Sequence, residues 1–560
     1  MATTNAAKKP VGYECRFAWF TKSKSGDDDA HIIKEIVHYD DNTTGTNVRT
    51  VKNHPRKYWT TKPGYRNHED KKEYEKMEYL DEHVTTQSKL LSAASRSLGQ
   101  PFFRGTMRQL QDSPYLYGTD ISSTALIKQQ YKQKYNLATP YTYSAFDTET
   151  DVVNKETFNE IIIATIAFSN EVYTFVQERF VKGYTNVIFE VETIAKKVMG
   201  HVIDEKNLKL NIKIVPTEID IVKEVFRIAH EKRPDFIGVW NLPFDINKVL
   251  EACKKAKIDP EDLFSDPSVN KEFRFFKFIE GKASKTSASN KRFNFKPAHR
   301  WHTLLAPSSF YFTDAMCVFR HVRAGQPEEP NYKLDSILKK YTKVQKIEFE
   351  MAKHLTGTAQ HQFMQSKYPL HYIVYNIFDA MNMIILDEEI RDHSIQLPVF
   401  ADISDFKDFN SNPKLTIDAM HPFAISHNWV MGSTSSDMTD DFDEETVDLS
   451  GWIVMLPSNM VADNGLELIE QYEAYRTNIR AHVADLDVSS SYPRAGVVYN
   501  ISKRTTEKEI INIEGVGDYT QRMSTINFTC GATNAVEIAT ALFKLPSLEE
   551  LSDAYDRDMG

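Results

Sequence analysis

The acidic residues whose spacing is most suggestive of chemistry lie in three short segments. Asp147 and Glu149 are two residues apart in YSAFDTET, Asp245 ends WNLPFD, and Tyr375 and Asp379 are four residues apart in YNIFDAM. Four converging carboxylates can hold two divalent cations, which stabilise the attacking and leaving oxygens at a phosphodiester. These residue types therefore point to metal-dependent phosphoryl chemistry.

The first two acids need a strand to bring them together. Residues 143–150 have the pattern of a strand, in which side chains two positions apart point to the same face. Asp147 and Glu149 would then lie side by side, which is costly in apolar surroundings without a cation. An edge strand with two solvated acids is the alternative, and the D-x-E spacing alone does not separate the two.

The other three residues also have simpler explanations. Asp245 follows an apolar strand at 236–240, and the end of such a strand is where α/β sheets place their sites. A helix also begins there, so Asp245 as a helix N-cap is the alternative. Tyr375 and Asp379 would share one face of a helix over 370–390, and a phenol beside a carboxylate can orient a water. A buried tyrosine–aspartate hydrogen bond is the alternative.

The elements around these residues alternate. Strands are predicted at 160–168 and 171–176, and apolar residues at helical spacing predict helices at 217–230 and 246–253. We therefore expect an α/β fold with a mixed sheet.

The order of these motifs resembles that of the DEDD 3′–5′ proofreading exonucleases of the tyrosine subtype, which have a ribonuclease-H-like fold. The resemblance implies two Mg²⁺ or Mn²⁺ ions per active site, with Tyr375 orienting the water nucleophile. The implied metal ligands are Asp147, Glu149, Asp245 and Asp379. Asn241 and Phe244 would contact DNA, although Asn241 lies one residue closer to the aspartate than in the usual N-x-x-x-F-D motif of family B polymerases.

A further motif follows near the C-terminal end. The stretch DVSSSYP, Asp487–Pro493, resembles motif A of family B DNA polymerases, D-x-x-S-L-Y-P, with serine where leucine is usual. The resemblance implies that Asp487 binds the metals of polymerisation, and that the following turn binds the incoming nucleotide through its amides and a tyrosine ring. The implied nucleotide-binding residues are Ser489, Ser490, Ser491 and Tyr492. A strand ending in a solvated turn is the alternative.

Taken together, the segments resemble the N-terminal part of the replicative family B polymerases of large tailed phages. The expected α/β multidomain architecture has an N-terminal β-rich domain (1–140), a ribonuclease-H-like exonuclease domain (141–395), a connecting segment partly returning to the N-terminal domain (396–475) and the first part of a palm (476–560). No K-x-x-x-N-S-x-Y-G or D-T-D polymerase motif is found. A split polymerase, completed by a second chain with fingers and thumb, or a truncated product is therefore expected.

The partners implied are primer-template and single-stranded DNA, deoxynucleoside triphosphates and that second chain. The sequence does not decide whether a sliding clamp also binds. Two other functions compete. A stand-alone DEDD exonuclease would lack the motif A resemblance, and a non-catalytic scaffold would not need the acids and the tyrosine.

Residues 271–300 form a basic segment in an acidic chain. They hold nine Lys or Arg against two Glu, a net charge of +7, whereas the whole chain has −10. Interleaved phenylalanines would stack on unpaired bases, and family B polymerases carry a primer-transferring hairpin in this interval. Candidate phosphate contacts are Lys282, Lys285, Lys291 and Arg292. A strand pair with core phenylalanines and a solvated basic loop is the alternative.

Composition limits the class of protein. The 560 residues are 41% hydrophobic and 12% aromatic, which excludes wholesale disorder and suggests three or four domains. No apolar run approaches the roughly 18 residues of a membrane span, and MATTNAAKKP has no apolar signal core. The four cysteines form no Cys-x-x-Cys pair, so neither a disulfide framework nor a thiolate zinc site is expected. We expect a soluble cytoplasmic protein, in the host cytoplasm if it is viral.

Overall fold

The computed structural model describes residues 8–26, 28–286, 292–342 and 349–433, with further isolated positions and strands beyond them. The chain divides into two compact units, Met1–Val447 and Asp448–Gly560. In the second unit three strands form an antiparallel sheet in the order β19-β20-β21. These are β19 (Thr506–Asn512), β20 (Arg522–Cys530) and β21 (Thr533–Asn534).

The first unit is a mixed α/β structure built on a six-stranded sheet, in the order β11-β10-β9-β8-β12-β17. Strand β9 runs antiparallel to β8 and β10, and the other neighbouring pairs are parallel. The strands are β8 (Tyr143–Thr150), β9 (Ile161–Ala167), β10 (Glu171–Gln177), β11 (Lys209–Val215), β12 (Phe236–Val239) and β17 (Tyr311–Asp314). The four strands predicted from the sequence are confirmed, with ends that differ by at most one residue.

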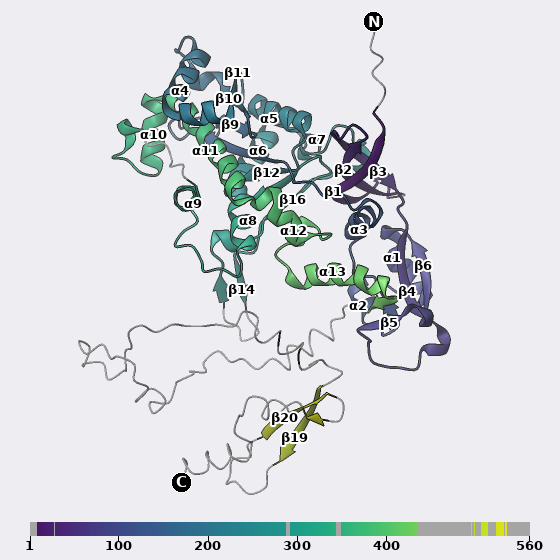
Figure 1. The fold of residues 1–560 in the computed structure, drawn as a ribbon. Coiled ribbons are helices and arrows are strands. Elements are labelled where there is room, and N and C mark those ends of the chain that lie inside the picture. Colours follow the sequence, from purple (N-terminus) through teal and green to yellow (C-terminus); the bar gives the residue numbers. More distant parts are fainter. Residues whose placement is uncertain are drawn as a thin grey trace, which may run out of the picture. The chain divides into compact units, whose positions relative to one another are not determined.

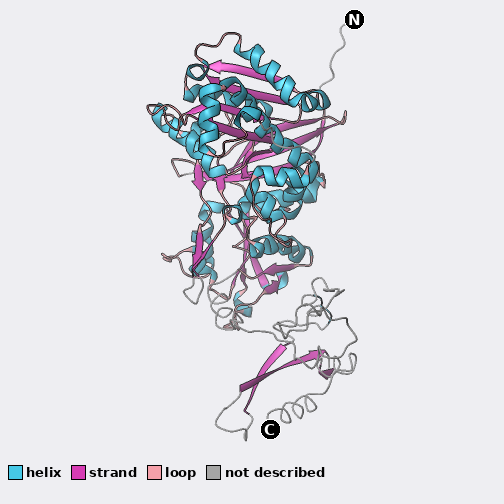
Figure 2. Cartoon of the chain, turned by 90° about the vertical axis from the view of Figure 1, so that its left-hand side faces the viewer, coloured by secondary structure: helices cyan, strands magenta, loops and turns pink. Residues whose placement is uncertain are grey.

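Helices cover both faces of this sheet (Figures 1 and 2). Helices α4 and α11 pack on one face and α5 and α6 on the other. The predicted helices are confirmed as α5 (Glu218–Lys232), α6 (Leu242–Ala256) and α11 (Pro369–Ile390), and α4 (Val187–Lys206) was not predicted. Smaller helices on the way are α7 (Pro260–Phe264), α8 (Ala315–Val322), α9 (Leu334–Tyr341) and α10 (Thr358–Lys367).

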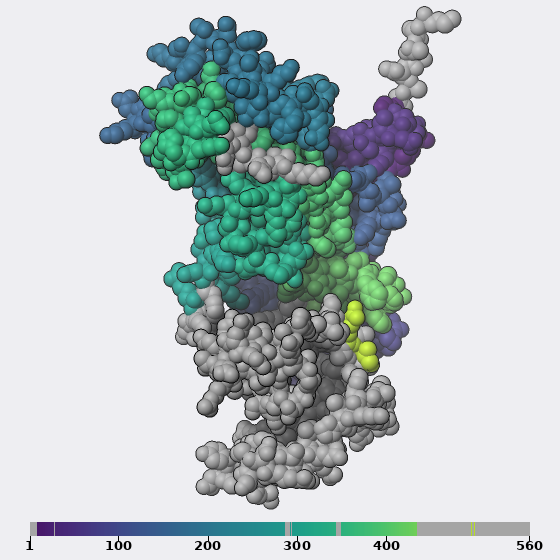
Figure 3. Space-filling model, turned by 60° about the vertical axis from the view of Figure 1, so that its left-hand side comes forward, coloured from purple at the N-terminus to yellow at the C-terminus, as the bar shows by residue number. Residues whose placement is uncertain are grey.

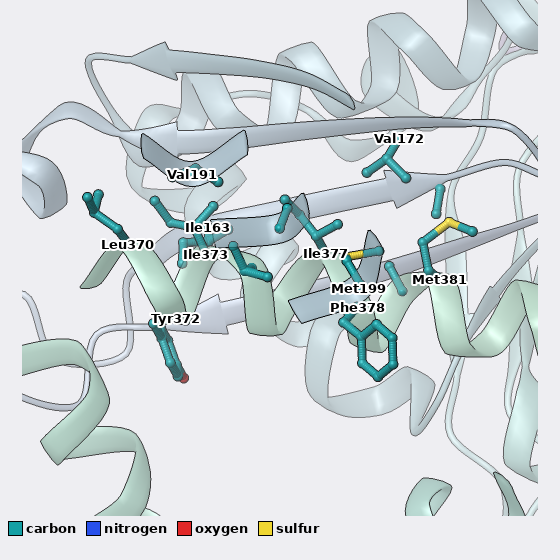
Figure 4. Packing of buried hydrophobic residues seen from close by; sticks show 14 of the residues in the cluster. Ile163, Val172, Val191, Met199, Leu370, Tyr372, Ile373, Ile377, Phe378 and Met381 are labelled. Carbon is teal, nitrogen blue, oxygen red and sulfur yellow. The ribbon is translucent and has the colours of Figure 1, made fainter. Parts of the chain in front are cut away.

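Helix α11 is buried along most of its length, because it lies between the sheet and its neighbouring helices. Its apolar residues Ile373 and Ile377 pack with Val191 and Met199 of α4 and with Ile163 of β9 (Figure 4). A helix that is apolar nearly all round belongs in the core of a large protein. Polar side chains on such a helix therefore need specific partners.

The N-terminal region is rich in strands. Its strands form one sheet in the order β1-β2-β3 and another in the order β6-β4-β7. The strands are β1 (Pro10–Lys22), β2 (Asp29–Tyr39), β3 (Thr44–Lys52), β4 (Arg56–Thr61), β5 (Tyr74–Lys76), β6 (Leu80–Thr85) and β7 (Leu116–Tyr117). The helices are α1 (Leu90–Ser97), α2 (Met107–Gln111) and α3 (Ser123–Tyr135).

After α11 the chain returns to this N-terminal region. Helices α12 (Leu397–Ala401) and α13 (Asn412–Ser426) lead to β18 (Trp429–Met431), which pairs antiparallel with β5. The Lys414 ammonium donates to the carbonyl of Asp120 at 3.1 Å. Figure 3 shows the green residues of this segment against the bluish residues of the N-terminal region.

A buried ion pair joins the N-terminal sheet to the central sheet. The Lys34 ammonium of β2 lies 2.6 Å from the Asp235 carboxylate, which directly precedes β12, and both side chains are almost fully buried. The same ammonium donates to the carbonyl of Pro234 at 2.7 Å. Burial opposes ionisation of Asp235, but the cations of Lys34 and Arg16 hold its pKa below the ordinary value.

The basic segment has two short strand pairs, and its first phenylalanines belong to the core. Strand β13 (Lys277–Ile279) pairs with β16 (Thr303–Leu305), and β14 (Ser284–Thr286) pairs with β15 (Arg292–Asn294). Phe273 is buried, and Phe275, Phe276 and Phe278 pack against buried clusters. These phenylalanines therefore lie in the core, as the strand-pair alternative expects.

In the described part of the chain, no helix has the length and apolar character needed to cross a membrane.

Candidate active site

The two acids of β8 lie on the sheet face that α11 covers. Asp147 pairs with Thr165 of β9, and Glu149 pairs with Ile163, whose side chain belongs to the α11-facing core. Both acids are half-buried, whereas Thr148 between them is buried. Strand β8 is an inner strand of the sheet, although β12 pairs with it only at residues 143–145 and the acids lie in the part that pairs with β9.

Helix α11 contacts each of these acids through a different side chain. The Tyr372 hydroxyl donates to Oε2 of Glu149, and Nδ2 of Asn376 donates to Oδ2 of Asp147 at 2.6 Å. Four residues of helix rise about 6 Å and two residues of strand about 6.7 Å. The two repeats match, so successive helix turns meet successive acids of β8.

Tyr375 lies among the candidate acids. Its ring stacks on Tyr372, with centroids 5.7 Å apart and planes inclined by 6°. Burial, followed by the negative charges of Asp379, Glu149 and Asp147, raises the pKa of Tyr375 well above its ordinary value. The phenol is therefore protonated. The carboxylates that raise its pKa come from α11 and from β8.

Asp245 reaches the same strand from the other side. It lies in the first turn of α6, and its Oδ1 accepts from the backbone N–H of Thr148 at 3.0 Å and from the Thr148 hydroxyl at 2.6 Å. Because Thr148 stands between Asp147 and Glu149, the Asp245 carboxyl lies against the peptide that joins the two acids. Burial raises the pKa of Asp245 to about 7.

The helix N-cap interpretation of Asp245 is wrong. Asn241 occupies the N-cap position of α6, with φ of 85° and no side-chain capping bond. The start of α6 is held instead by Asp314, at the end of β17, whose Oδ2 accepts from the N–H of Leu242 at 3.0 Å. Its Oδ1 accepts from the N–H of Cys317 at 3.1 Å.

The acids suit hard cations, because carboxylate oxygens are the ligands that Mg²⁺ and Mn²⁺ prefer. In the described part of the chain, however, no three of the four candidate acids bring ligand atoms within 4.8 Å of one another. Like charges disfavour a closer approach when no cation lies between them. A two-metal site also spans a wider volume, since its ions lie about 3.5–4 Å apart.

A different cluster does meet that spacing, among His302, Asp314 and Cys317. Nδ1 of His302 accepts from the N–H of Gly281 at 3.2 Å, so in the neutral ring the proton sits on Nε2, which faces Asp314 at 4.0 Å. Burial lowers the pKa of His302 to about 4, so the ring is neutral near pH 7. A metal-binding histidine donates its other N–H outward, which is the opposite arrangement. This cluster does not fit a metal ion.

The candidate DNA contacts are exposed where the structure describes them. Phe244 is 48% exposed on α6. Lys282, Lys285 and Arg292 are exposed around the β14–β15 pair, where Nε of Arg292 donates to the Ser284 hydroxyl at 3.1 Å. Six further predicted site residues lie outside the described residues: Lys291, Asp487, Ser489, Ser490, Ser491 and Tyr492.

Three residues at the site were not predicted from the sequence. Tyr372 and Asn376 precede Asp379 by seven and three positions, so all three share one face of α11. A polar row on an otherwise apolar helix is a signal that could have found the first two. His361 of α10 comes near only through the tertiary fold, and its Nδ1 lies 3.8 Å from Oε2 of Glu149.

Comparison with protein-family models and with curated proteins found no match to this chain.

Proposed function

We propose that the 141–395 region is a two-metal 3′–5′ exonuclease acting on single-stranded DNA, with a ribonuclease-H-like fold. One observation supports the proposal. At the carboxyl end of two parallel strands, α11 contacts both acids of β8 and also carries Tyr375 and Asp379, while Asp245 of α6 accepts from Thr148 between the two acids. Parallel α/β sheets place their sites at such ends.

Two bound Mg²⁺ or Mn²⁺ ions would activate a water and stabilise the leaving oxygen of the phosphodiester. The proposed ligands are Asp147, Glu149, Asp245 and Asp379. Tyr375 remains a protonated phenol beside them, so it can donate to or orient the attacking water. The exposed Phe244 ring on α6 would stack on a terminal base.

The wider proposal is that the chain is the N-terminal portion of a replicative family B DNA polymerase that works with a second chain. It rests on the resemblance of Asp487–Pro493 to motif A. Primer extension by the chain with a candidate partner, comparing wild type with Asp487→Ala, tests it. Equal extension by both proteins would refute the motif A assignment.

The nuclease proposal is tested with single-stranded DNA labelled at its 5′ end. With Mg²⁺ or Mn²⁺, wild type should give a ladder that shortens from the 3′ end one nucleotide at a time. Asp147→Ala should lose this activity by at least about 100-fold, a typical loss for removing a group that acts at the reacting centre. An Asp147→Ala protein as active as wild type would refute the assignment of this site.

A further inference from the structure

Tyr372 and Asn376 stand one helical turn apart on α11, and neither belongs to the set of acids and tyrosine proposed above. Tyr372 is 2% exposed and Asn376 is fully buried. Figure 4 shows Tyr372 leaving the helix on the side opposite Leu370. Such buried polar groups are retained where their hydrogen bonds are made.

Tyr372 is itself held by a second residue. A phenol has one proton, and that of Tyr372 is donated to Oε2 of Glu149, which as a carboxylate can only accept. Nδ1 of His361 lies 2.8 Å from the same phenol oxygen, so this contact is a hydrogen bond when His361 donates. His361 also packs edge-on against the rings of Tyr372 and Tyr375, with centroid distances of 5.8 and 6.0 Å.

Asn376 is held in a comparable way from the sheet. Its Nδ2 donates to Asp147, and its Oδ1 accepts from the Thr165 hydroxyl at 2.6 Å. Since Thr165 gives its proton to Asn376, it accepts from the Thr174 hydroxyl of β10, 2.9 Å away. A relay of three buried side chains therefore fixes which way the amide faces, and with it one oxygen of Asp147.

We propose that Tyr372 and Asn376 are a pair of positioning residues that fix the carboxylate rotamers of Glu149 and Asp147 for metal binding. This inference rests on the proposed nuclease function. Two like-charged carboxylates on one strand face repel one another. Neutral donors from one helix hold each of them without competing for the metal as another ligand. Partners of this kind orient metal ligands elsewhere, and their loss costs about 10- to 100-fold in metal affinity or activity.

The test compares Tyr372→Phe and Asn376→Leu with Tyr368→Phe. Tyr368 is the control because it lies at the start of the same helix and its ring contacts Phe363 and His371 rather than the β8 acids. Single-turnover cleavage of single-stranded DNA is measured over a Mn²⁺ titration. DNA affinity in Ca²⁺ and thermal melting are measured in parallel.

Tyr372→Phe and Asn376→Leu should raise the half-saturating Mn²⁺ concentration or lower the single-turnover rate by about 10- to 100-fold. DNA affinity and melting of Tyr372→Phe should stay near wild type, as should every property of Tyr368→Phe. His361→Asn, which keeps a donor near the Nδ1 position, should retain more activity than His361→Leu.

Wild-type rate and Mn²⁺ dependence in a folded Tyr372→Phe protein would overturn the inference while leaving the nuclease proposal intact. Equal activities of His361→Asn and His361→Leu would show that His361 has no part in positioning Tyr372. If wild type cleaves no faster than Asp147→Ala, the proposed function itself fails, and direct Mn²⁺ binding then decides the inference. Equal Mn²⁺ affinity of wild type and Tyr372→Phe by calorimetry would overturn it in that case.

Discussion

At the scale of single residues, the candidate site and its surroundings hold carboxyl groups whose burial disfavours their ionised form. Asp245 is the clearest case, because burial raises its pKa from 3.8 to about 7. Asp314, which holds the start of the same helix, is also buried, and its pKa rises to about 6. In the metal-free chain, burial therefore favours the protonated forms of these two carboxyls more than exposure to water would. A bound divalent ion would remove that preference, because metal ligands must be deprotonated.

The raised pKa of Asp245 predicts the pH dependence of stability in metal-free buffer. The folded pKa of Asp245 lies above its unfolded value. The stability that this difference contributes to the fold is therefore fully present below about pH 4 and is lost as the pH rises through 7. Asp245→Asn keeps an oxygen for Thr148 but cannot ionise. At pH 8 with EDTA it should be more stable than wild type, by at most about 4 kcal/mol.

The measurement is urea unfolding of both proteins at several pH values. The stability difference between them should shrink as the pH falls from 8 toward 4, because the folded wild type then holds Asp245 in its protonated form. A difference that is constant from pH 4 to 8 would contradict a raised pKa for Asp245.

At the scale of elements, the strands and helices that carry the site follow from the sequence. Apolar runs bounded by turns were enough for the strands β8, β9, β10 and β12, and helical spacing or a long apolar run was enough for α5, α6 and α11. The i, i+4 spacing of Tyr375 and Asp379 also placed them on one helix face. What failed was the N-cap interpretation of Asp245, since local patterns do not show that its partner is Thr148, 97 positions away.

The contacts between elements were also beyond sequence reasoning. Asn376 and Tyr372 look like ordinary residues of a buried helix until α11 is laid across β8 in register. Helix α4 was missed, although its apolar residues Val187, Val191, Ala195, Met199 and Val202 recur at helical spacing. Its backbone is non-helical at Met199, a kink that the apolar spacing does not predict.

The ion pair between β2 and the start of β12 gives a prediction at this scale. Lys34→Met leaves Asp235 buried with Arg16 as its remaining nearby cation, whose Nε is 3.5 Å away. Breaking a buried pair from one side typically costs about 3–5 kcal/mol. We expect Lys34→Met to lose stability in that range, and a Lys34→Met, Asp235→Asn double variant to recover part of it.

Denaturant unfolding of the two single variants and the double variant measures this coupling. Additive effects of Lys34→Met and Asp235→Asn would contradict a direct interaction between the N-terminal sheet and the central sheet.

At the scale of the whole molecule, the charge distribution separates a basic surface loop from an acidic chain. The net charge is −10, whereas residues 271–300 carry +7. Part of that segment is structural, because its first phenylalanines pack in the core. The exposed cations around β14 and β15 are then left as the candidate phosphate contacts.

Replacing Lys282, Lys285 and Arg292 together with alanine should weaken binding to single-stranded DNA and reduce its salt dependence. Each lost phosphate contact lowers the slope of log affinity against log salt by roughly 0.7 for single strands. Fluorescence anisotropy between low and moderate salt gives this slope. The matched control replaces Lys196, Lys197 and Lys209, three exposed lysines of α4 and β11. Equal slopes for the two triple variants would leave the basic loop without a role in DNA binding.

The central claim is that the acids of β8, α6 and α11 form a two-metal site, and anomalous diffraction tests it most directly. Crystals of the chain would be soaked with Mn²⁺ and a nucleoside monophosphate, and the ions located by their anomalous signal. The account predicts two peaks about 3.5–4 Å apart, with Asp147, Glu149, Asp245 and Asp379 as the protein ligands. Mn²⁺ bound instead at His302, Asp314 and Cys317, or an acid site that stays empty at saturating Mn²⁺, would contradict it.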